Sequence, residues 1–268
     1  GGAANQSITL STIGGASSTS TLAFSNTIKA KGSGSITLSA GFISGSGVLA
    51  TTSLSANSAT GMTLATQATS FGSIRNLASG TVTISQTGAA VLTSAVINGN
   101  LSLTASGAIS QAGGAVIVTG TTVLDAGGAA ITLDSSSNDF GGGVTVNSSS
   151  TSVSLRDANA LTISALSLAA NATLTAVAGT TLSMPAANIS TGTGNINLQS
   201  LGSALSTTGT LTTTSGTISL FAGGSLTIGH GITTSSGAIT LGANGGLTIG
   251  QGVTTSSGSI TFNGSSAG

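Results

Sequence analysis

The stretch SGTISLFAGGSLTIGHGITTSSGAITLGANGGLTIGQGVTTSSGSITF, residues 215–262, decides the fold, because its segments recur at one constant spacing. The hexapeptides SGTISL, SGAITL and SGSITF begin at Ser215, Ser236 and Ser257, which gives a period of about 21 residues. The pieces GSLTIG and GITT between them are each followed, one period later, by GGLTIG and GVTT. One period thus contains three short strand-like pieces, separated by turns of Gly or Ser.

Apolar and small polar residues alternate within each piece, as in Leu247, Thr248 and Ile249. A period of two is typical of a half-buried strand. Helix is excluded, because each of the 42 Gly would cost roughly 0.5–1 kcal/mol in a helix interior.

A period near 21 with three strands matches one coil of a parallel β-helix and is shorter than a propeller blade of about 40 residues. We therefore predict an all-β chain that forms a right-handed parallel β-helix (β-solenoid). About 21 residues form each coil, three short strands lie in each coil, and roughly 12 coils stack along the chain. Columns of Ile, Leu and Val are expected inside, and columns of Thr and Ser outside.

The period continues towards the amino terminus beneath considerable sequence drift. Three apolar series follow it: Ile232, Leu211, Ile189 and Leu168; Ile218, Ile196, Leu174, Val153 and Ile131; and Leu166, Val144, Val123 and Leu101. Further upstream, similar motifs begin at uneven intervals, at Ile8, Ile36, Met62 and Val82. We expect one continuous solenoid domain in which residues 1–100 form less regular coils and residues 101–268 form regular ones.

Pro and Asn residues mark the expected corners of the coils. Pro185 follows Met184 at the end of a predicted strand, where a missing amide donor does least damage. Five Asn residues fall near turns, where they tolerate left-handed backbone and can form hydrogen-bonded ladders: Asn98, Asn100, Asn171, Asn188 and Asn195.

The chain carries very little charge, with four basic residues, four Asp and no Glu. Binding to DNA, RNA or anionic lipid needs clustered Lys and Arg, so nucleic acid is not expected as a partner. The hydrophobic fraction of 38% favours a packed core over disorder. There is no Cys for a disulfide or a thiolate metal site, and no apolar run of about 18 residues that would predict membrane insertion.

Both ends are rich in Gly, Ser and Ala and show no charged or amphipathic cap. Residues 1–5 lack the basic start and apolar centre of a signal peptide, so any export signal is expected outside this segment. An uncapped β-helix exposes unpaired strand edges. We expect either a flanking solenoid of the same protein or end-to-end self-association of subunits.

Residues 101–163 resemble the repeat regions of filamentous-haemagglutinin-like bacterial exoproteins. The pieces that carry the resemblance are GAISQ at 107–111, NDFGG at 138–142 and DANAL at 157–161. Together with the degenerate period, the resemblance covers about two thirds of the chain. It implies a right-handed β-helical shaft that Gram-negative bacteria secrete by a two-partner route and display on the cell surface for adhesion.

Some β-helices degrade polysaccharides, which requires carboxylates that converge on one face. Asp139 precedes Arg156, and Asp134 precedes Asp157, by roughly one period, so neighbouring coils can bring such pairs together. We interpret them as structural ion pairs or turn caps. His230 is replaced by Gln251 one repeat later, so it is interpreted as an exposed corner side chain.

Other motifs are assigned to turns and surfaces. The pairs Gly113-Gly114, Gly127-Gly128 and Gly223-Gly224 precede neither Lys-Ser nor a helix and are interpreted as turns. No recurrent Asp supports a calcium repeat. Asn-x-Ser/Thr triplets, which are possible glycosylation sites, begin at Asn5, Asn100, Asn147, Asn171, Asn188 and Asn263.

An outward Thr lattice for ice binding is a further alternative. Its candidates are Thr9, Thr37, Thr83, Thr132, Thr227, Thr240, Thr248 and Thr261. The simpler interpretation is that Thr suits the exposed face of a strand.

The sequence therefore predicts a structural and adhesive shaft segment of a secreted bacterial surface protein or extracellular filament. Such a segment would serve cell attachment, aggregation or matrix formation. We expect no enzyme activity, no catalytic, cofactor-binding or metal site, and no cofactor. Host or environmental surfaces and glycans are the expected partners besides the solenoid itself. The alternatives are a polysaccharide-binding or polysaccharide-degrading β-helix and an ice-binding solenoid.

Overall fold

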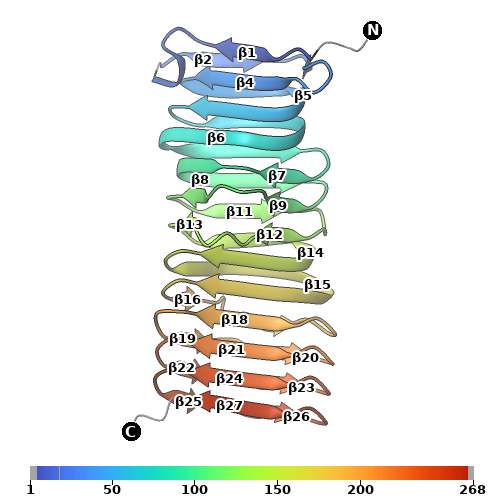
Figure 1. Ribbon diagram of the computed structural model, residues 1–268, viewed down its shortest axis with the longest axis vertical. Coiled ribbons are helices and arrows are strands. Elements are labelled where there is room, and N and C mark those ends of the chain that lie inside the picture. The colour runs from blue at the N-terminus through green and yellow to red at the C-terminus, as the bar shows by residue number, and fades with distance from the viewer. Residues whose placement is uncertain (1–4, 18, 265–268) are drawn as a thin grey trace. The chain divides into compact units, whose positions relative to one another are not determined.

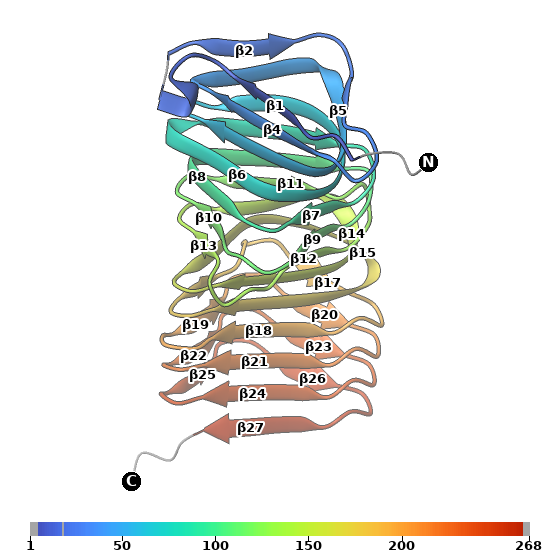
Figure 2. The same ribbon diagram turned by 45° about the horizontal axis from the view of Figure 1, so that its top comes forward.

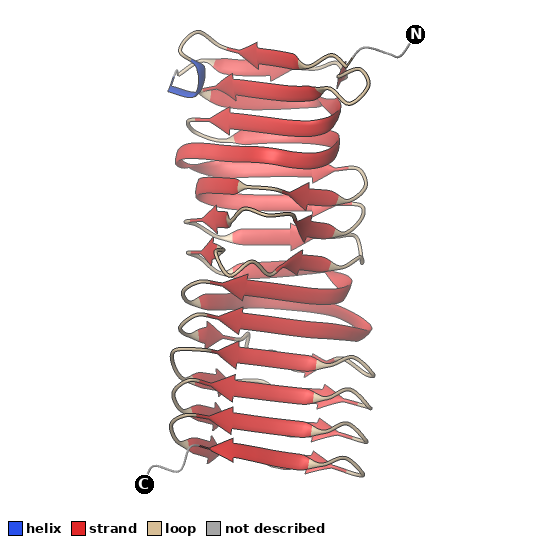
Figure 3. Cartoon of the chain, viewed as in Figure 1, coloured by secondary structure: helices blue, strands red, loops and turns tan. Residues whose placement is uncertain are grey.

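The computed structural model describes residues 5–17 and 19–264, apart from the side chain of Ser148. Parallel strands stack into a β-solenoid of about 12 coils, about 21 residues apart. Strands dominate Figure 3, and the short 3-10 turn η1 (Gly15–Ser17) is the one helical segment of the described ranges. The prediction of an all-β solenoid with coils of this length is confirmed.

The chain forms two compact units, unit 1 (residues 1–129 and 139–142) and unit 2 (residues 130–138 and 143–268). Figure 1 labels their strands. Unit 1 contains β1 (Ile8–Ser11), β2 (Thr21–Phe24), β3 (Ile28–Lys29), β4 (Ser35–Ala40), β5 (Phe42–Ser58), β6 (Met62–Gln86), β7 (Ala90–Leu92), β8 (Ala95–Ala105), β9 (Ile109–Gln111), β10 (Val116–Val118), β11 (Thr122–Asp125) and β13 (Asp139–Phe140). Unit 2 contains β12 (Ile131–Leu133), β14 (Val144–Asp157), β15 (Leu161–Ala178), β16 (Leu182–Ser183), β17 (Ile189–Ser190), β18 (Ile196–Ser200), β19 (Leu205–Thr207), β20 (Leu211–Thr213), β21 (Ile218–Ala222), β22 (Leu226–Ile228), β23 (Ile232–Thr234), β24 (Ile239–Ala243), β25 (Leu247–Ile249), β26 (Val253–Thr255) and β27 (Ile260–Gly264).

Three parallel ladders form the walls of unit 2. The long ladder joins β12, β14, β15, β18, β21, β24 and β27, the short ladder joins β15, β16, β19, β22 and β25, and the four-stranded ladder joins β17, β20, β23 and β26. The turned view of Figure 2 separates the strands of the four-stranded ladder from those of the long one. Each complete coil thus contributes one strand to every ladder, as predicted.

The apolar columns of the long and four-stranded ladders follow two of the predicted series. Register partners run through Ile131, Val153, Leu174, Ile196 and Ile218. All five side chains are buried, with exposed fractions of 0–1%. A fully buried side chain of this size contributes about 1.5–3 kcal/mol relative to an exposed one, so these columns supply the core.

The third predicted series is wrong at two of its steps. Leu101 pairs with Thr122, one residue before the predicted Val123. In the same ladder Leu103 pairs with Leu124. Because every second side chain of a strand points inward, the inward partner two residues before Leu124 is Thr122. The partner of Val144 is Ile163, since a register shift lies between Val144 and Thr145.

One step of the first series is also wrong. Ile189 pairs with Leu211, as predicted, but within the described residues it forms no ladder with Leu168.

Unit 1 keeps the stacking but varies the length of its coils. Ile8 pairs with Ile36, and Ile36 pairs with Leu54, so that a coil longer than the regular period is followed by a shorter one. The pairings of β5 with β6 and of β6 with β8 contain register shifts. Turns and bulges absorb the differences in length, while the inward columns continue.

Inward-pointing Thr hydroxyls stabilise one recurring turn of unit 2 by hydrogen bonding. Thr213 Oγ1 donates to the carbonyl oxygen of Gly216 at 2.6 Å, and the Gly237 N–H donates to Thr234 Oγ1 at 3.0 Å. Thr191 and Thr255 bond across their own turns in the same way. The motif Thr-x-x-Gly therefore closes each of these turns with an inward hydroxyl, a role that the alternating pattern had assigned to apolar side chains.

The Gly of this motif lies too close to the preceding coil to carry a side chain. A Cβ added at Gly237 would overlap the carbonyl oxygen of Gly216, and one added at Gly258 would overlap that of Gly237. By contrast, a Cβ at Gly246 would meet its nearest neighbour, Ser225 Oγ, at 3.9 Å. Close main-chain packing, rather than a left-handed backbone, thus requires glycine at the end of the motif.

We predict that Gly237→Ala destabilises the protein by about 1–3 kcal/mol, because an inserted methyl group forces the coils apart. Gly246→Ala is the matched control and should be neutral or stabilising by up to about 1 kcal/mol, since Ala restricts the unfolded chain. Thermal unfolding followed by circular dichroism measures both. Equal stability of the two variants would contradict this account.

We predict that Thr234→Val destabilises the protein by about 1–3 kcal/mol, because the buried Gly237 N–H loses its acceptor. Thr207 is also buried, but its hydroxyl has no hydrogen-bond partner in the described structure. Thr207→Val should therefore be neutral or stabilising. Denaturant titration of the two variants measures their free energies of unfolding. Equal values for the two variants would show that buried Thr only fills space.

Candidate functional site

Asp134 and Asp157 lie in different environments within unit 2. Asp157 ends β14 with an exposed fraction of 1%, and its Oδ1 accepts a hydrogen bond from the Asn159 N–H at 2.6 Å. Asp134 follows β12 and is exposed. A carboxylate that bonds to the main chain two residues ahead closes a turn, so Asp157 is a structural cap.

Asp139 and Arg156 belong to different units. Asp139 lies in β13 of unit 1, where it is the register partner of Ile117. Arg156 lies in β14 of unit 2, opposite Val177. Neither unit by itself therefore contains both members of the expected pair.

His230 is exposed in the turn between β22 and β23, and Gln251 is exposed in the equivalent turn one coil later. The Gly pairs also lie in turns: Gly113, Gly127 and Gly128 have positive φ. Within residues 5–17 and 19–264, no three His, Asp or Glu side chains gather where they could hold a metal ion. The described residues also contain no helix of the length and apolar character that spans a bilayer.

Neutral polar side chains form regular columns on the outside of unit 2. We call these columns, on the long and four-stranded ladders, the hydroxyl array: Ser154, Thr175, Asn197, Ser219, Thr240 and Thr261, with Ser190, Thr212, Thr233 and Thr254. All are half-buried or exposed. Since stacked strands are about 4.8 Å apart, the array repeats its donors and acceptors at that spacing.

The array does not have the paired Thr columns that would favour ice binding. All eight predicted Thr residues are half-buried or exposed, as expected for outward side chains. In the four-stranded ladder, however, each three-residue strand has one outward residue, because its flanking side chains point inward. The second outward column of the long ladder is mixed, with Val177, Gln199, Phe221, Gly242 and Asn263.

Four of the five predicted turn Asn residues bond to main chain of the following coil, whereas Asn98 Nδ2 donates to the Leu77 oxygen of the preceding coil at 2.8 Å. Asn188 Oδ1 accepts from the Thr210 N–H at 3.1 Å, and Asn195 Oδ1 accepts from the Thr217 N–H at 2.8 Å. Asn5, Asn100 and Asn171 make equivalent bonds. The Asn263 triplet ends at Ser265, outside the described residues.

Sequence reasoning missed a buried polar network in unit 1. Gln86 Nε2 donates to the carbonyl oxygens of Ala68, Thr87 and Ala89 at 2.8–3.0 Å. Its Oε1 accepts from Thr66 Oγ1 at 2.6 Å. Because every Gln86 polar atom is bonded, burial of the amide costs little. The sequence signal for the burial of Gln86 was its position two residues after Ile84, on the inward face of the same strand.

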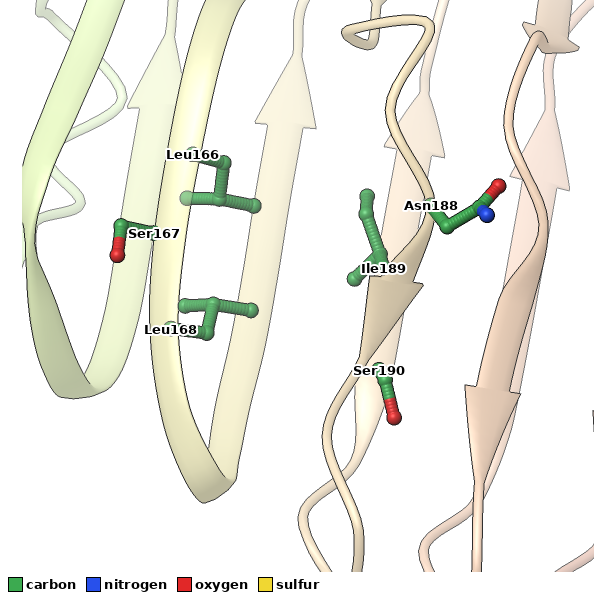
Figure 4. Close-up of a pocket in the computed structure, with 6 residues that line it drawn as sticks. All are labelled: Leu166, Ser167, Leu168, Asn188, Ile189 and Ser190. Atoms are coloured by element: carbon green, nitrogen blue, oxygen red, sulfur yellow. The ribbon is translucent and has the colours of Figure 1, made fainter.

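A cleft of about 300 Å³ interrupts the wall of unit 2 between β15 and β17. In Figure 4, Leu166 and Leu168 project to the same side of β15 and Ser167 to the other, with Asn188, Ile189 and Ser190 across the gap. No titratable side chain lines it. A groove of about 380 Å³ in unit 1 contains one carboxylate, Asp125, which bonds to the Gly127 N–H at 2.9 Å.

Residues 79–147 match a family described as repeats of unknown function (DUF5649). The match covers about a quarter of the chain, in agreement with the repeats seen here. No curated protein and no solved structure matches the chain.

We predict that Asp157→Ala destabilises the protein by about 1–3 kcal/mol, because the turn loses the hydrogen bond from the Asn159 N–H to the buried carboxylate. The exposed Asp134→Ala is the control and should lie within about 0.5 kcal/mol of the parent. Thermal melts give both values. A stable Asp157→Ala variant would contradict the structural role of this carboxylate.

Proposed function

We propose that the chain is a structural and adhesive shaft segment of a secreted bacterial surface protein, serving attachment, aggregation or matrix formation. The observation that carries the proposal is the hydroxyl array, which presents neutral donors and acceptors at a fixed repeat. Ligands with many hydroxyl groups, such as glycans, can form multiple weak hydrogen bonds to such a surface. The resemblance to filamentous-haemagglutinin-like exoproteins supports the secreted location.

The mechanical part of the proposal rests on the stacked ladders. Main-chain hydrogen bonds run from coil to coil, for example from the Ile218 N–H to the Ala238 oxygen at 2.9 Å. Their repetition on three walls lets a load along the stack be shared among many bonds. A protein of this kind needs no catalytic centre, and we propose that it has none.

The partner that we propose for the last described coil is a second solenoid, either a flanking part of the same protein or a second copy. Apolar side chains of β25 and β27 remain uncovered there: Leu247, Ile249, Ile260 and Phe262 have exposed fractions of 36–53%. Further strands in the same register would bury these side chains and pair the open edges.

The proposed function is tested by a glycan array probed with the purified chain at low and at high salt. We expect retention by neutral glycans that changes less than about twofold with salt, because a nearly uncharged surface has little electrostatic attraction to screen. Changing Thr212, Thr233 and Thr254 together to Val should reduce retention several-fold. The matched Ser variants keep the hydroxyl groups and should bind like the parent.

Undiminished retention of the Val variant would show that the array is not the binding surface. A chain that binds no glycan and sediments as a monomer at every concentration would contradict the adhesive and stacking roles. Release of reducing ends from a polysaccharide would instead support the enzyme alternative.

A further inference from the structure

The junction between the coil of β15 and the following coil is held less completely than its neighbours. Two register pairs join them on the short ladder and five on the long ladder. On the remaining wall β17 begins the four-stranded ladder, and the described residues show no pairing of β17 with β15. The next junction, from β17 to β20, has all three ladders.

The segment Met184–Ser190 makes its hydrogen bonds in one direction. Ile189 N–H donates to the Thr210 oxygen at 2.8 Å, and Asn188 Oδ1 accepts from Thr210 N–H. Thr208 Oγ1 donates to the Met184 oxygen at 3.4 Å. All of these partners lie in the following coil, and the described segment has none in the preceding one. Pro185, which has no N–H, lies within this segment.

The cleft of about 300 Å³ occupies the place of the missing ladder. Leu166 and Leu168 at its edge are half-buried, whereas the apolar side chains of the intact ladder, such as Leu211 and Ile232, are 2% and 0% exposed. The coils therefore lose both main-chain bonds and apolar packing on this side. Few buried contacts and missing main-chain bonds are the conditions for local opening.

We propose that this junction is a built-in seam at which unit 2 opens first, by breaking the hydrogen bonds of its two remaining ladders. Opening separates the coil of β15 from that of β16–β18 and exposes Leu168 and Ile189 while the coils on either side stay intact. The inference rests on the hydrogen-bond pattern and the cleft, and it holds whether or not the chain is an adhesin.

Hydrogen exchange of four bonded amides tests the seam. The Leu161 and Leu174 N–H groups bond across it to the oxygens of Thr181 and Asn195 at 3.0 and 2.8 Å. The Leu205 and Ile196 N–H groups bond across later junctions, to the oxygens of Ser225 and Thr217 at 3.0 and 2.9 Å. We expect the Leu161 and Leu174 amides to exchange at least about tenfold faster than the Leu205 and Ile196 amides, although the hydrogen bonds of the two pairs have similar lengths. Equal protection of the two pairs would overturn the proposal.

A disulfide clamp gives a second, independent test. Thr162 and Ser183 are outward register partners that span the seam, and the chain contains no other Cys. Oxidised Thr162→Cys with Ser183→Cys should slow exchange of the Leu174 amide to the rate of Ile196, and reduction should reverse the effect. The control clamp, Ser206→Cys with Thr227→Cys, spans an intact junction and should leave the Leu174 amide unchanged. Equal slowing by both clamps would refute a local seam.

Discussion

The main-chain hydrogen bond between neighbouring coils is the constraint on which the rest of the structure depends. Parallel strands must lie about 4.8 Å apart to form it, whatever the length of the chain between them. Unit 1 meets this requirement with coils of unequal length, since turns and bulges can lengthen without disturbing the strands. The same spacing leaves no room for a Cβ at Gly237, beside the Gly216 oxygen. At Gly237, therefore, distance rather than backbone conformation requires glycine.

Polar groups enter the interior where they complete the main-chain bonding. Thr234 accepts from an amide that no ladder satisfies, and Gln86 bonds to three carbonyl oxygens beside it. Such side chains occupy core positions and also supply the hydrogen bonds that close a turn. Thr122 and Thr207 occupy similar inward positions without a bond to their hydroxyls in the described structure. An inward Thr can therefore either stabilise the fold through a hydrogen bond or bury a hydroxyl group that has no partner in the described structure.

The strict period predicted the columns through Ile131 and Ile218, because strand register and sequence spacing coincide there. It failed at Val123, where the pattern preferred the more apolar neighbour although the register selects Thr122. It also failed between Leu168 and Ile189, since spacing alone does not reveal whether two coils are close enough to bond. Sequence suggested Asp157 as a structural residue, but not its burial, and the polar network around Gln86 was missed altogether.

The near-identity of successive coils has a consequence for how the chain reaches this structure. Ile218, Ile239 and Ile260 are equivalent partners, so a strand displaced by one whole coil meets almost the same side chains as in its native place. Translational degeneracy of this kind offers misthreaded states that local packing barely distinguishes. Irregular coils, such as that of β16–β18, have no equivalent elsewhere. A strand displaced by one coil cannot match them, so they distinguish the native stacking order from the misthreaded ones.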